Sequence, residues 1–360
     1  MSGISEVYEQ LAKHLNKLPS GFPRTPTGVE LRILKKLFTP EEAKIACLLT
    51  MKPETAEEIA NRAGIESDLV AEMLENMARK GLIFRIRKGD QRKYMAAQFI
   101  IGIWEYHVKD LDEELVKYVR EYVPYFFQPL MKLKTPQLRV VPVPEALSAV
   151  QSVMPYEEAR KLVEGQELIA VAPCICRKEH QLMGEGCSRP IESCLIFGVA
   201  AQYYIDNNLG RRIDVDEALK ILEEAEKDAR VLQPSNSRRI ANICTCCGCC
   251  CQILTNLKKL PKPAHFVVSR FVANIDAEKC VLCGTCVERC QMDAIELGDE
   301  HAILDKDRCI GCGLCITTCP EEAISFEEKP KELQKDVPER LWDTYTKIFQ
   351  ERTEALSAPT

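Results

Sequence analysis

The stretch that decides the fold is IDAEKCVLCGTCVERCQMDAIEL, residues 275–297, followed by LDKDRCIGCGLCITTCPEEAISF, residues 304–326. The second segment repeats the first with an offset of 29 residues, measured from Cys280 to Cys309. Each segment carries cysteines in the order C-x2-C-x2-C-x3-C, which puts three thiolates on one iron–sulfur cube and the fourth on a second cube. The pattern predicts two [4Fe–4S] clusters on eight cysteines: Cys280, Cys283, Cys286, Cys290, Cys309, Cys312, Cys315 and Cys319.

This repeat closely resembles the bacterial-type two-cluster ferredoxins, and the resemblance implies how the ligands divide. One cube takes Cys280, Cys283, Cys286 and Cys319, and the other takes Cys309, Cys312, Cys315 and Cys290. A small shared core is expected from apolar residues that match between the repeats: Ile275, Ile295, Leu304 and Ile324. The chain departs from the family at Gln291, where proline usually follows the fourth cysteine. That change is expected to alter local hydrogen bonding or solvent access rather than ligation.

The composition points to a reduced, globular protein of several domains. The 360 residues are 46% hydrophobic and 28% charged, and the net charge of −6 argues against attraction of the whole molecule to nucleic acid. Of 19 cysteines, 18 lie between Cys174 and Cys319, in C-x-C and C-x-x-C runs that suit metals better than disulfides. No apolar signal core or membrane-length segment occurs, so a cytoplasmic, anaerobic setting is expected.

A first additional cysteine group has the spacing C-x-C-x10-C-x6-C and comprises Cys174, Cys176, Cys187 and Cys194. We expect a buried strand, ELIAVAPC, to run into Cys174 and a helix to start near Cys194. Four thiolates placed in this way fit one more [4Fe–4S] cube, with tetrahedral zinc as the alternative. Basic neighbours such as Arg177 and Arg189 would offset the negative charge of a thiolate-bound cluster.

A second group comprises Cys244, Cys246, Cys247, Cys249, Cys250 and Cys251. Six cysteines cannot all bind one cube, so either some are structural or the run is shared between two metal sites. The run is distantly similar to the CCG-type sequences of heterodisulfide-reductase-like proteins, which hold non-cubane clusters. The long-spaced partner cysteines of that family are absent here, so its chemistry is not carried over. A redox-active thiol or a substrate-binding role is a further alternative.

The sequence pattern of residues 40–100 predicts three helices followed by a hairpin. The helices are expected from Pro40 to about Met51, from Thr55 to Gly64 and from Ser67 to Gly81, and the hairpin turns at Gly89. This order resembles the winged helix-turn-helix domain of many bacterial and archaeal regulators, which implies binding to DNA.

The charges of this domain support two opposite interpretations, binding to DNA and binding to proteins. The hairpin is basic and suits phosphate contacts, with Arg85, Arg87, Lys88, Arg92 and Lys93. The candidate recognition helix is acidic where it would meet the phosphates of DNA, with Glu66, Asp68, Glu72 and Glu75. We therefore favour contacts with proteins over contacts with DNA for this domain. Cys47 lies on the apolar face of the first helix and is expected to be a core residue.

The predicted fold class is α+β and multidomain: a winged helix, a central α/β cysteine-rich domain, and a ferredoxin-like module with a helical tail. The expected segments are an N-terminal helix and arm (1–39), the winged helix (40–100), a helical segment and linker (101–165), the cysteine-rich domain (166–271), the ferredoxin-like domain (272–328) and the tail (329–360). Aromatic residues of the helical segment are expected to belong to a core or a docking surface rather than a cofactor site, and Pro136, Pro142 and Pro144 mark the linker.

These features favour an electron-transfer protein, or a subunit of an anaerobic oxidoreductase complex, with two ferredoxin-type clusters and one or two more. Its partners would be redox proteins that donate and accept electrons, in a larger complex or a homo-oligomer. The alternative is an iron–sulfur-dependent, redox-sensing transcriptional regulator. A stand-alone catalyst is less favoured, because no general acid–base pair, phosphate loop or nucleotide fingerprint accompanies the cysteines.

Overall fold

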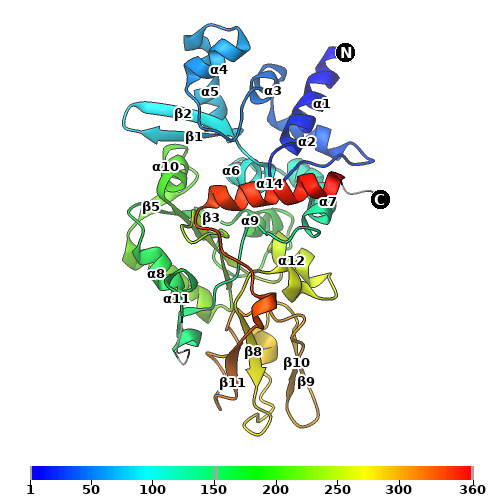
Figure 1. Cartoon of the computed structure of the whole chain (residues 1–360), viewed down its shortest axis with the longest axis vertical. Coiled ribbons are helices and arrows are strands. Elements are labelled where there is room, and N and C mark those ends of the chain that lie inside the picture. The colour runs from blue at the N-terminus through cyan, green and yellow to red at the C-terminus, as the bar shows by residue number, and fades with distance from the viewer. Residues whose placement is uncertain (1, 149, 151–152, 358–360) are drawn as a thin grey trace.

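The computed structural model describes residues 2–148, 150 and 153–357. Figure 1 shows the winged helix at one end of the long axis, a cysteine-rich sheet in the middle and the ferredoxin-like module at the opposite end. The expected fold class is confirmed in this arrangement. Among the described residues, no helix has the length and apolar character needed to cross a membrane.

The winged helix forms through local signals that the sequence carries. Its elements are α3 (Pro40–Ala46), α4 (Ala56–Ala63), α5 (Ser67–Arg79), β1 (Ile83–Lys88) and β2 (Gln91–Ala96). Thr39 and Thr55 each cap a helix in a reciprocal capping box with a glutamate three residues later. Gly64 ends α4 with a left-handed conformation (φ 68°) that few other residues adopt. The first helix ends at Ala46, before the expected Met51.

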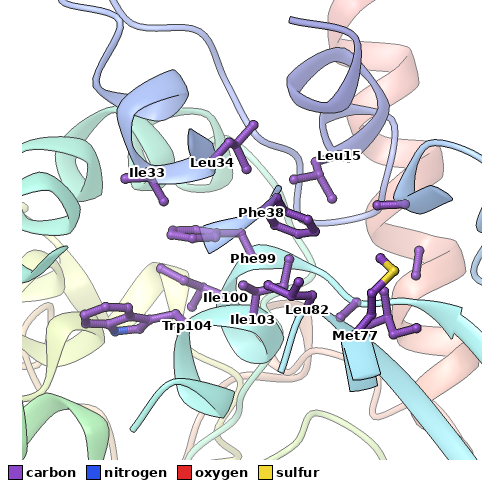
Figure 2. Close-up of a cluster of buried hydrophobic side chains, with 14 of the residues drawn as sticks. Leu15, Ile33, Leu34, Phe38, Met77, Leu82, Phe99, Ile100, Ile103 and Trp104 are labelled. Carbon is purple, nitrogen blue, oxygen red and sulfur yellow. The ribbon is translucent and has the colours of Figure 1, made fainter. Parts of the chain in front are cut away.

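The N-terminal segment and the residues after the hairpin share one core with the winged helix. The elements that join it are α1 (Ser2–Asn16), α2 (Val29–Leu37), η1 (Phe99–Ile103), α6 (Trp104–Tyr106) and α7 (Glu113–Leu130). Figure 2 shows side chains of this core, including Leu15, Phe38, Met77, Phe99 and Trp104. The N-terminal arm and the helical segment therefore pack against the winged helix in this core.

The cysteine-rich region is built on a five-stranded antiparallel sheet in the order β5-β3-β4-β7-β6. Its strands are β3 (Ile169–Pro173), β4 (Glu192–Phe197), β5 (Arg211–Ile213), β6 (Val231–Pro234) and β7 (Asn242–Cys246). The predicted helix near Cys194 is wrong, because residues 192–197 pair with a strand on each side and pack as the buried centre of the sheet. The helix α10 (Gly198–Asp206) begins only after this strand.

Helices and an extended segment cover the sheet. The helices are α8 (Ala159–Glu164), α9 (Ile175–Leu182), α11 (Val215–Lys227) and α12 (Gln252–Lys258), and short 3-10 turns lie at Pro144–Leu147 and Pro155–Glu157. The segment 136–144, which its prolines marked as a linker, packs against the sheet in an extended conformation, and we call it the strap. Val141 pairs with Leu232 of β6, and the N–H of Val143 donates to the carbonyl of Cys312 at 3.0 Å. The strap thus joins the sheet to the ferredoxin-like module.

The ferredoxin-like module contains two small two-stranded antiparallel sheets around its own core. Strand β8 (Phe271–Ile275) pairs with β11 (Ile324–Glu328), and β9 (Ile295–Leu297) pairs with β10 (Ala302–Leu304), while α13 (Thr285–Arg289) lies in the first repeat. Of the four matched apolar residues, Ile295 and Ile324 are buried, and Ile275 and Leu304 pack against them. After turns at Pro263–Phe266 and Lys331–Leu333, the chain ends in α14 (Leu341–Ser357), which crosses back to the winged-helix end (Figure 1).

Candidate metal centres

Four backbone amides donate hydrogen bonds to cysteine sulfurs of the ferredoxin-like module. The N–H groups of Ala294 and Ala323 donate to the sulfurs four residues before them, Cys290 and Cys319, at 3.2 and 3.3 Å. The N–H groups of Ala273 and Ala302 reach across to the other repeat, donating to Cys309 and Cys280 at 3.5 and 3.4 Å. Both pairs of donors are 29 residues apart, so the hydrogen bonds follow the internal repeat. Hydrogen bonds of this kind stabilise thiolates and set the potential of a bound cluster.

The two cysteine loops of this module differ in their contact with solvent. Cys283 of the first loop is exposed, whereas Cys315 of the second is buried. Burial raises the pKa of the Cys312 thiol to about 12, and it raises the pKa of Cys309 as well. A cube on the first loop would therefore meet solvent, and a cube on the second would lie inside the protein.

Comparison with known families now identifies two parts of the chain. Residues 273–326 match the 4Fe-4S dicluster domain. This match and the cysteine arrangement show that the dicluster domain carries [4Fe–4S] clusters. Residues 38–99 match the family model of the sugar-specific transcriptional regulator TrmB. Neither match covers residues 100–272, and searches of curated proteins and of solved structures found no match.

A compact set of four thiols lies beside the dicluster domain. The sulfurs of Cys187, Cys247, Cys249 and Cys250 all lie within 4.8 Å of one another, and the separations Cys187–Cys250 and Cys249–Cys250 are both 3.7 Å. Thiolates around a single tetrahedral ion, with metal–sulfur bonds of about 2.3 Å, stand about 3.8 Å apart. The guanidinium of Arg189 donates to the sulfur of Cys249 at 3.7 Å. We call these four cysteines the four-thiol set.

The remaining six cysteines form a closed ring. Each sulfur interacts with two others of the ring, in the order Cys174, Cys176, Cys251, Cys246, Cys244, Cys194 and back to Cys174. All six line one cavity of about 80 Å³. We call them the six-thiol ring. Together with the dicluster domain and the four-thiol set, the ring places each of the 18 clustered cysteines in one group.

The structure groups these cysteines differently from their order in the chain. Cys187 lies with the four-thiol set rather than with Cys174, Cys176 and Cys194, and the run from Cys244 to Cys251 divides between the two groups. The sheet explains the division, because Leu195 pairs with Ile243 and this register brings Cys194 beside Cys244. Cys244 and Cys246 share one face of β7, as residues two apart in a strand do. The C-x-C spacing in a strand was the signal available in the sequence.

Charged and polar side chains surround the ring. The guanidinium of Arg177 is buried and donates to the hydroxyl of Ser193 and the carbonyl of Thr245. Burial disfavours its charge, but the thiols of Cys174, Cys247 and Cys194 outweigh this and raise its pKa. The carboxyl of Glu105 lines the same cavity, and burial raises its pKa to about 8. The sequence had pointed to Arg177 but not to Glu105.

The dicluster domain touches the cysteine-rich region at Gln291. The side-chain oxygen of Gln291 accepts a hydrogen bond from the N–H of Gly248 at 2.8 Å. Gln291 follows Cys290 in the chain, and Gly248 lies between Cys247 and Cys249. The residue that departs from the ferredoxin pattern is therefore the one that joins two cysteine groups. Cys47 lies apart from them, partly buried against the core of the winged helix.

The wing of the winged helix rests on the cysteine-rich region. Arg87 of β1 pairs with Asp206 of α10 at 2.7 Å, and Arg85, which is 4% exposed, reaches the same carboxylate at 3.3 Å. The hydroxyl of Tyr203 lies 2.8 Å from the carbonyls of Ala78 and Ile83, at the turn between α5 and β1. Two of the five basic wing residues are thus tied to the cysteine-rich region by ion pairs. Arg87 is nevertheless exposed, as are Lys88, Arg92 and Lys93.

Proposed function

We propose that this protein transfers single electrons between its dicluster domain and metal centres in the cysteine-rich region. The contact between Gln291 and Gly248 carries the proposal, because it joins the loop after Cys290 to the turn that holds Cys247 and Cys249. The iron–sulfur clusters give the chain a redox role. This contact provides a path from those clusters to the metal centres of the cysteine-rich region. A free-standing carrier would need no such junction.

The order of transfer follows from exposure. The cube that we assign to Cys280, Cys283, Cys286 and Cys319 meets solvent, so an external redox protein exchanges electrons there. The cube on Cys309, Cys312, Cys315 and Cys290 comes next. The four-thiol set follows as the site of a single iron ion, since zinc has no redox chemistry, and the six-thiol ring comes last. Arg177 interacts electrostatically with cysteines of both sets and lines the cavity of the ring.

The surface near the first cube suits a transient protein partner. Three large apolar side chains of this domain are exposed: Val281 by 60%, Leu297 by 52% and Ile303 by 47%. Leu297 lies next to Gly284 in the first cysteine loop. Exposed apolar side chains beside a redox centre are what a docking partner buries. We infer that the electron donor or acceptor binds here, in an anaerobic cytoplasm and as part of an oxidoreductase system.

Replacing Cys312 by alanine tests the relay. The variant is expected to lose or cripple the inner cube and to block reduction of the metal centres in the cysteine-rich region by a viologen-linked donor. The measurement is anaerobic stopped-flow spectroscopy with freeze-quench EPR, and Cys47→Ala is the matched control. Undiminished reduction of the remaining centres in Cys312→Ala would refute a linear chain.

A second candidate function is an iron–sulfur-dependent transcriptional regulator. The match of residues 38–99 to the TrmB model favours it, together with the exposed basic residues of the wing. The acidic start of α5 and the docking of Arg85 and Arg87 oppose it. A gel-shift assay on the DNA upstream of the gene, with oxidised and reduced protein, separates the two. Sequence-specific binding at moderate salt would show that electron transfer is not the complete function.

A further inference from the structure

We propose that the six-thiol ring binds one iron–sulfur cluster that is ligated by all six cysteines and is therefore different from a cubane. The inference deepens the proposed function, on which it rests only for the supply of electrons. It concerns Cys174, Cys176, Cys194, Cys244, Cys246 and Cys251.

The number of ligands is the first argument. A tetrahedral zinc or iron ion binds four thiolates, and a [4Fe–4S] cube also binds four. Either centre would leave two cysteines of the ring without a metal. The ring offers no natural division into four and two, because every sulfur interacts with two neighbours and all six line one cavity.

The spacing of the sulfurs is the second argument. In the described part of the chain, the four-thiol set is the group of three or more candidate ligands whose atoms all lie within 4.8 Å of one another. No three sulfurs of the ring meet that limit, and no three of the dicluster domain meet it either. The ring is thus more open than the four-thiol set, although each of its sulfurs still interacts with two neighbours.

This spacing also excludes a pair of zinc ions that share thiolates. Each ion of such a pair would hold four sulfurs about 3.8 Å apart, so sets of three within 4.8 Å would occur. The ring contains no such set among its described residues. Inorganic sulfide between the irons of a cluster accounts for the wider ring, because it moves the thiolates outward from the centre.

The surroundings of the ring are the third argument. Asn242 donates its side-chain amide to the sulfur of Cys244 at 3.5 Å, and Gln233 donates to that of Cys251 at 3.8 Å. Such N–H to sulfur bonds also occur in the dicluster domain, where they support cluster ligands. These amide donors and the buried guanidinium of Arg177 are placed as the polar partners of a negatively charged cluster are.

The cavity continues into an apolar space rather than ending at the ring. Ile100, Ile101, Phe127, Leu138 and Ile253 line both the ring cavity and a second cavity of about 80 Å³ beyond it. These walls offer no further ligand atoms. Two other candidate ligands line the ring cavity, the carboxyl of Glu105 and the sulfur of Cys247, which belongs to the four-thiol set. The proposal assigns the cluster to the six ring sulfurs, and the apolar walls keep water from it.

Six single Cys→Ser variants of the ring, purified anaerobically, test this ligation. Iron and zinc are measured by mass spectrometry, and the clusters are examined by 57Fe Mössbauer and EPR spectroscopy after chemical reduction. We expect iron in the parent protein to exceed the roughly eight atoms of two cubes. Each of the six variants should shift or abolish one and the same extra signal, while Cys249→Ser and Cys47→Ser leave that signal in place.

Two outcomes would overturn the proposal: an effect of only four of the six substitutions, or zinc in place of iron in the ring. The signals of the dicluster domain report whether each variant is folded. If all six variants fail to fold, the parent protein decides, because stepwise chelation followed by alkylation counts the cysteines that one cluster protects. Chemical reduction needs no donor protein, so the relay can fail while the ring result stands, and the converse also holds.

Discussion

The side-chain oxygen of Gln291 accepts the N–H of Gly248 across the boundary between the dicluster domain and the cysteine-rich region. Both residues are buried, and each is next to a cysteine in the chain. Proline, which usually follows the fourth cysteine in ferredoxins, has no side-chain acceptor and could not make this bond. A single side chain therefore adapts a ferredoxin pattern to a fixed internal partner.

Replacing Gln291 by leucine should weaken this junction. The buried N–H of Gly248 would lose its acceptor, which costs about 1–3 kcal/mol. We expect slower electron transfer into the cysteine-rich region with both cubes intact, measured by stopped-flow spectroscopy. Gln291→Glu keeps an acceptor oxygen and is the matched control. Equal transfer rates in the leucine variant and the parent would show that electron transfer does not depend on this contact.

Gly248→Ala should disrupt the same junction by crowding. A Cβ atom at Gly248 would lie 2.3 Å from the backbone oxygen of Gln291, far closer than such atoms approach. Because that neighbour is backbone, the turn itself must move, and the four-thiol set moves with it. We expect loss of metal from this set and retention of the dicluster signals, measured by metal analysis and EPR. Gly165→Ala is the control, because a Cβ there meets only the carbonyl oxygen of Lys161 at 3.5 Å, an ordinary contact.

Asp206→Ala should release the wing from the cysteine-rich region. The change removes the carboxylate shared by Arg85 and Arg87, and Arg85 is almost fully buried. Loss of hydrogen bonds to a charged group costs about 2 kcal/mol. The free energy of unfolding should fall by this order, and hydrogen exchange in β1 should rise. Glu121→Ala removes an exposed partner of Arg32 and should cost under about 1 kcal/mol. Equal effects of the two substitutions would argue against a docked wing.

The two cubes should differ in their resistance to oxidants. Cys283 is exposed in the first loop, whereas in the second loop Cys315 is buried and Cys312 is partly buried. We expect ferricyanide to remove the first cube before the second, as followed by Mössbauer spectroscopy of the 57Fe protein. Loss of both cubes at one rate would contradict the assigned difference in exposure.

His107 should make stability depend on pH. The side chain is buried, its Nδ1 contacts the carbonyl of Ile103, and burial lowers its pKa in the folded protein. The unfolded chain therefore binds more protons, and stability is lost as pH falls below about 6.5. Denaturation followed by the fluorescence of the buried Trp104 should show this slope between pH 7.5 and 5.5. His107→Gln should reduce the slope, and an unchanged slope would assign it to other groups.

Local patterns predicted the parts of the fold that depend on neighbours in the chain. The cysteine spacing from Cys280 to Cys319 marked the dicluster domain, and the caps at Thr39 and Thr55 marked the helices of the winged helix. Residues 192–197 were misread, because a short apolar run fits a buried strand and a helix equally well until its partners are known. The pairing of that run with two strands decides the matter.

The grouping of the other ten cysteines depends on contacts that are distant in the chain. Cys187 joins residues about 60 positions later, and the register of β4 with β7 brings Cys194 beside Cys244. The spacing of cysteines in the sequence predicts which of them are close along one segment, but it cannot predict contacts between segments that are distant in the chain. Gln291 was noticed as a departure from the ferredoxin pattern, but its partner Gly248 could be found only in three dimensions.

The last helix, α14, ties the end of the chain to its beginning. Arg352 donates to the carbonyls of Leu18 and Pro19, and Glu351 accepts from Thr135. The N-terminal helices are synthesised before α14, so their contacts with Arg352 form only after α14 has been synthesised. Damage to α14 would consequently loosen the N-terminal body that Arg352 holds.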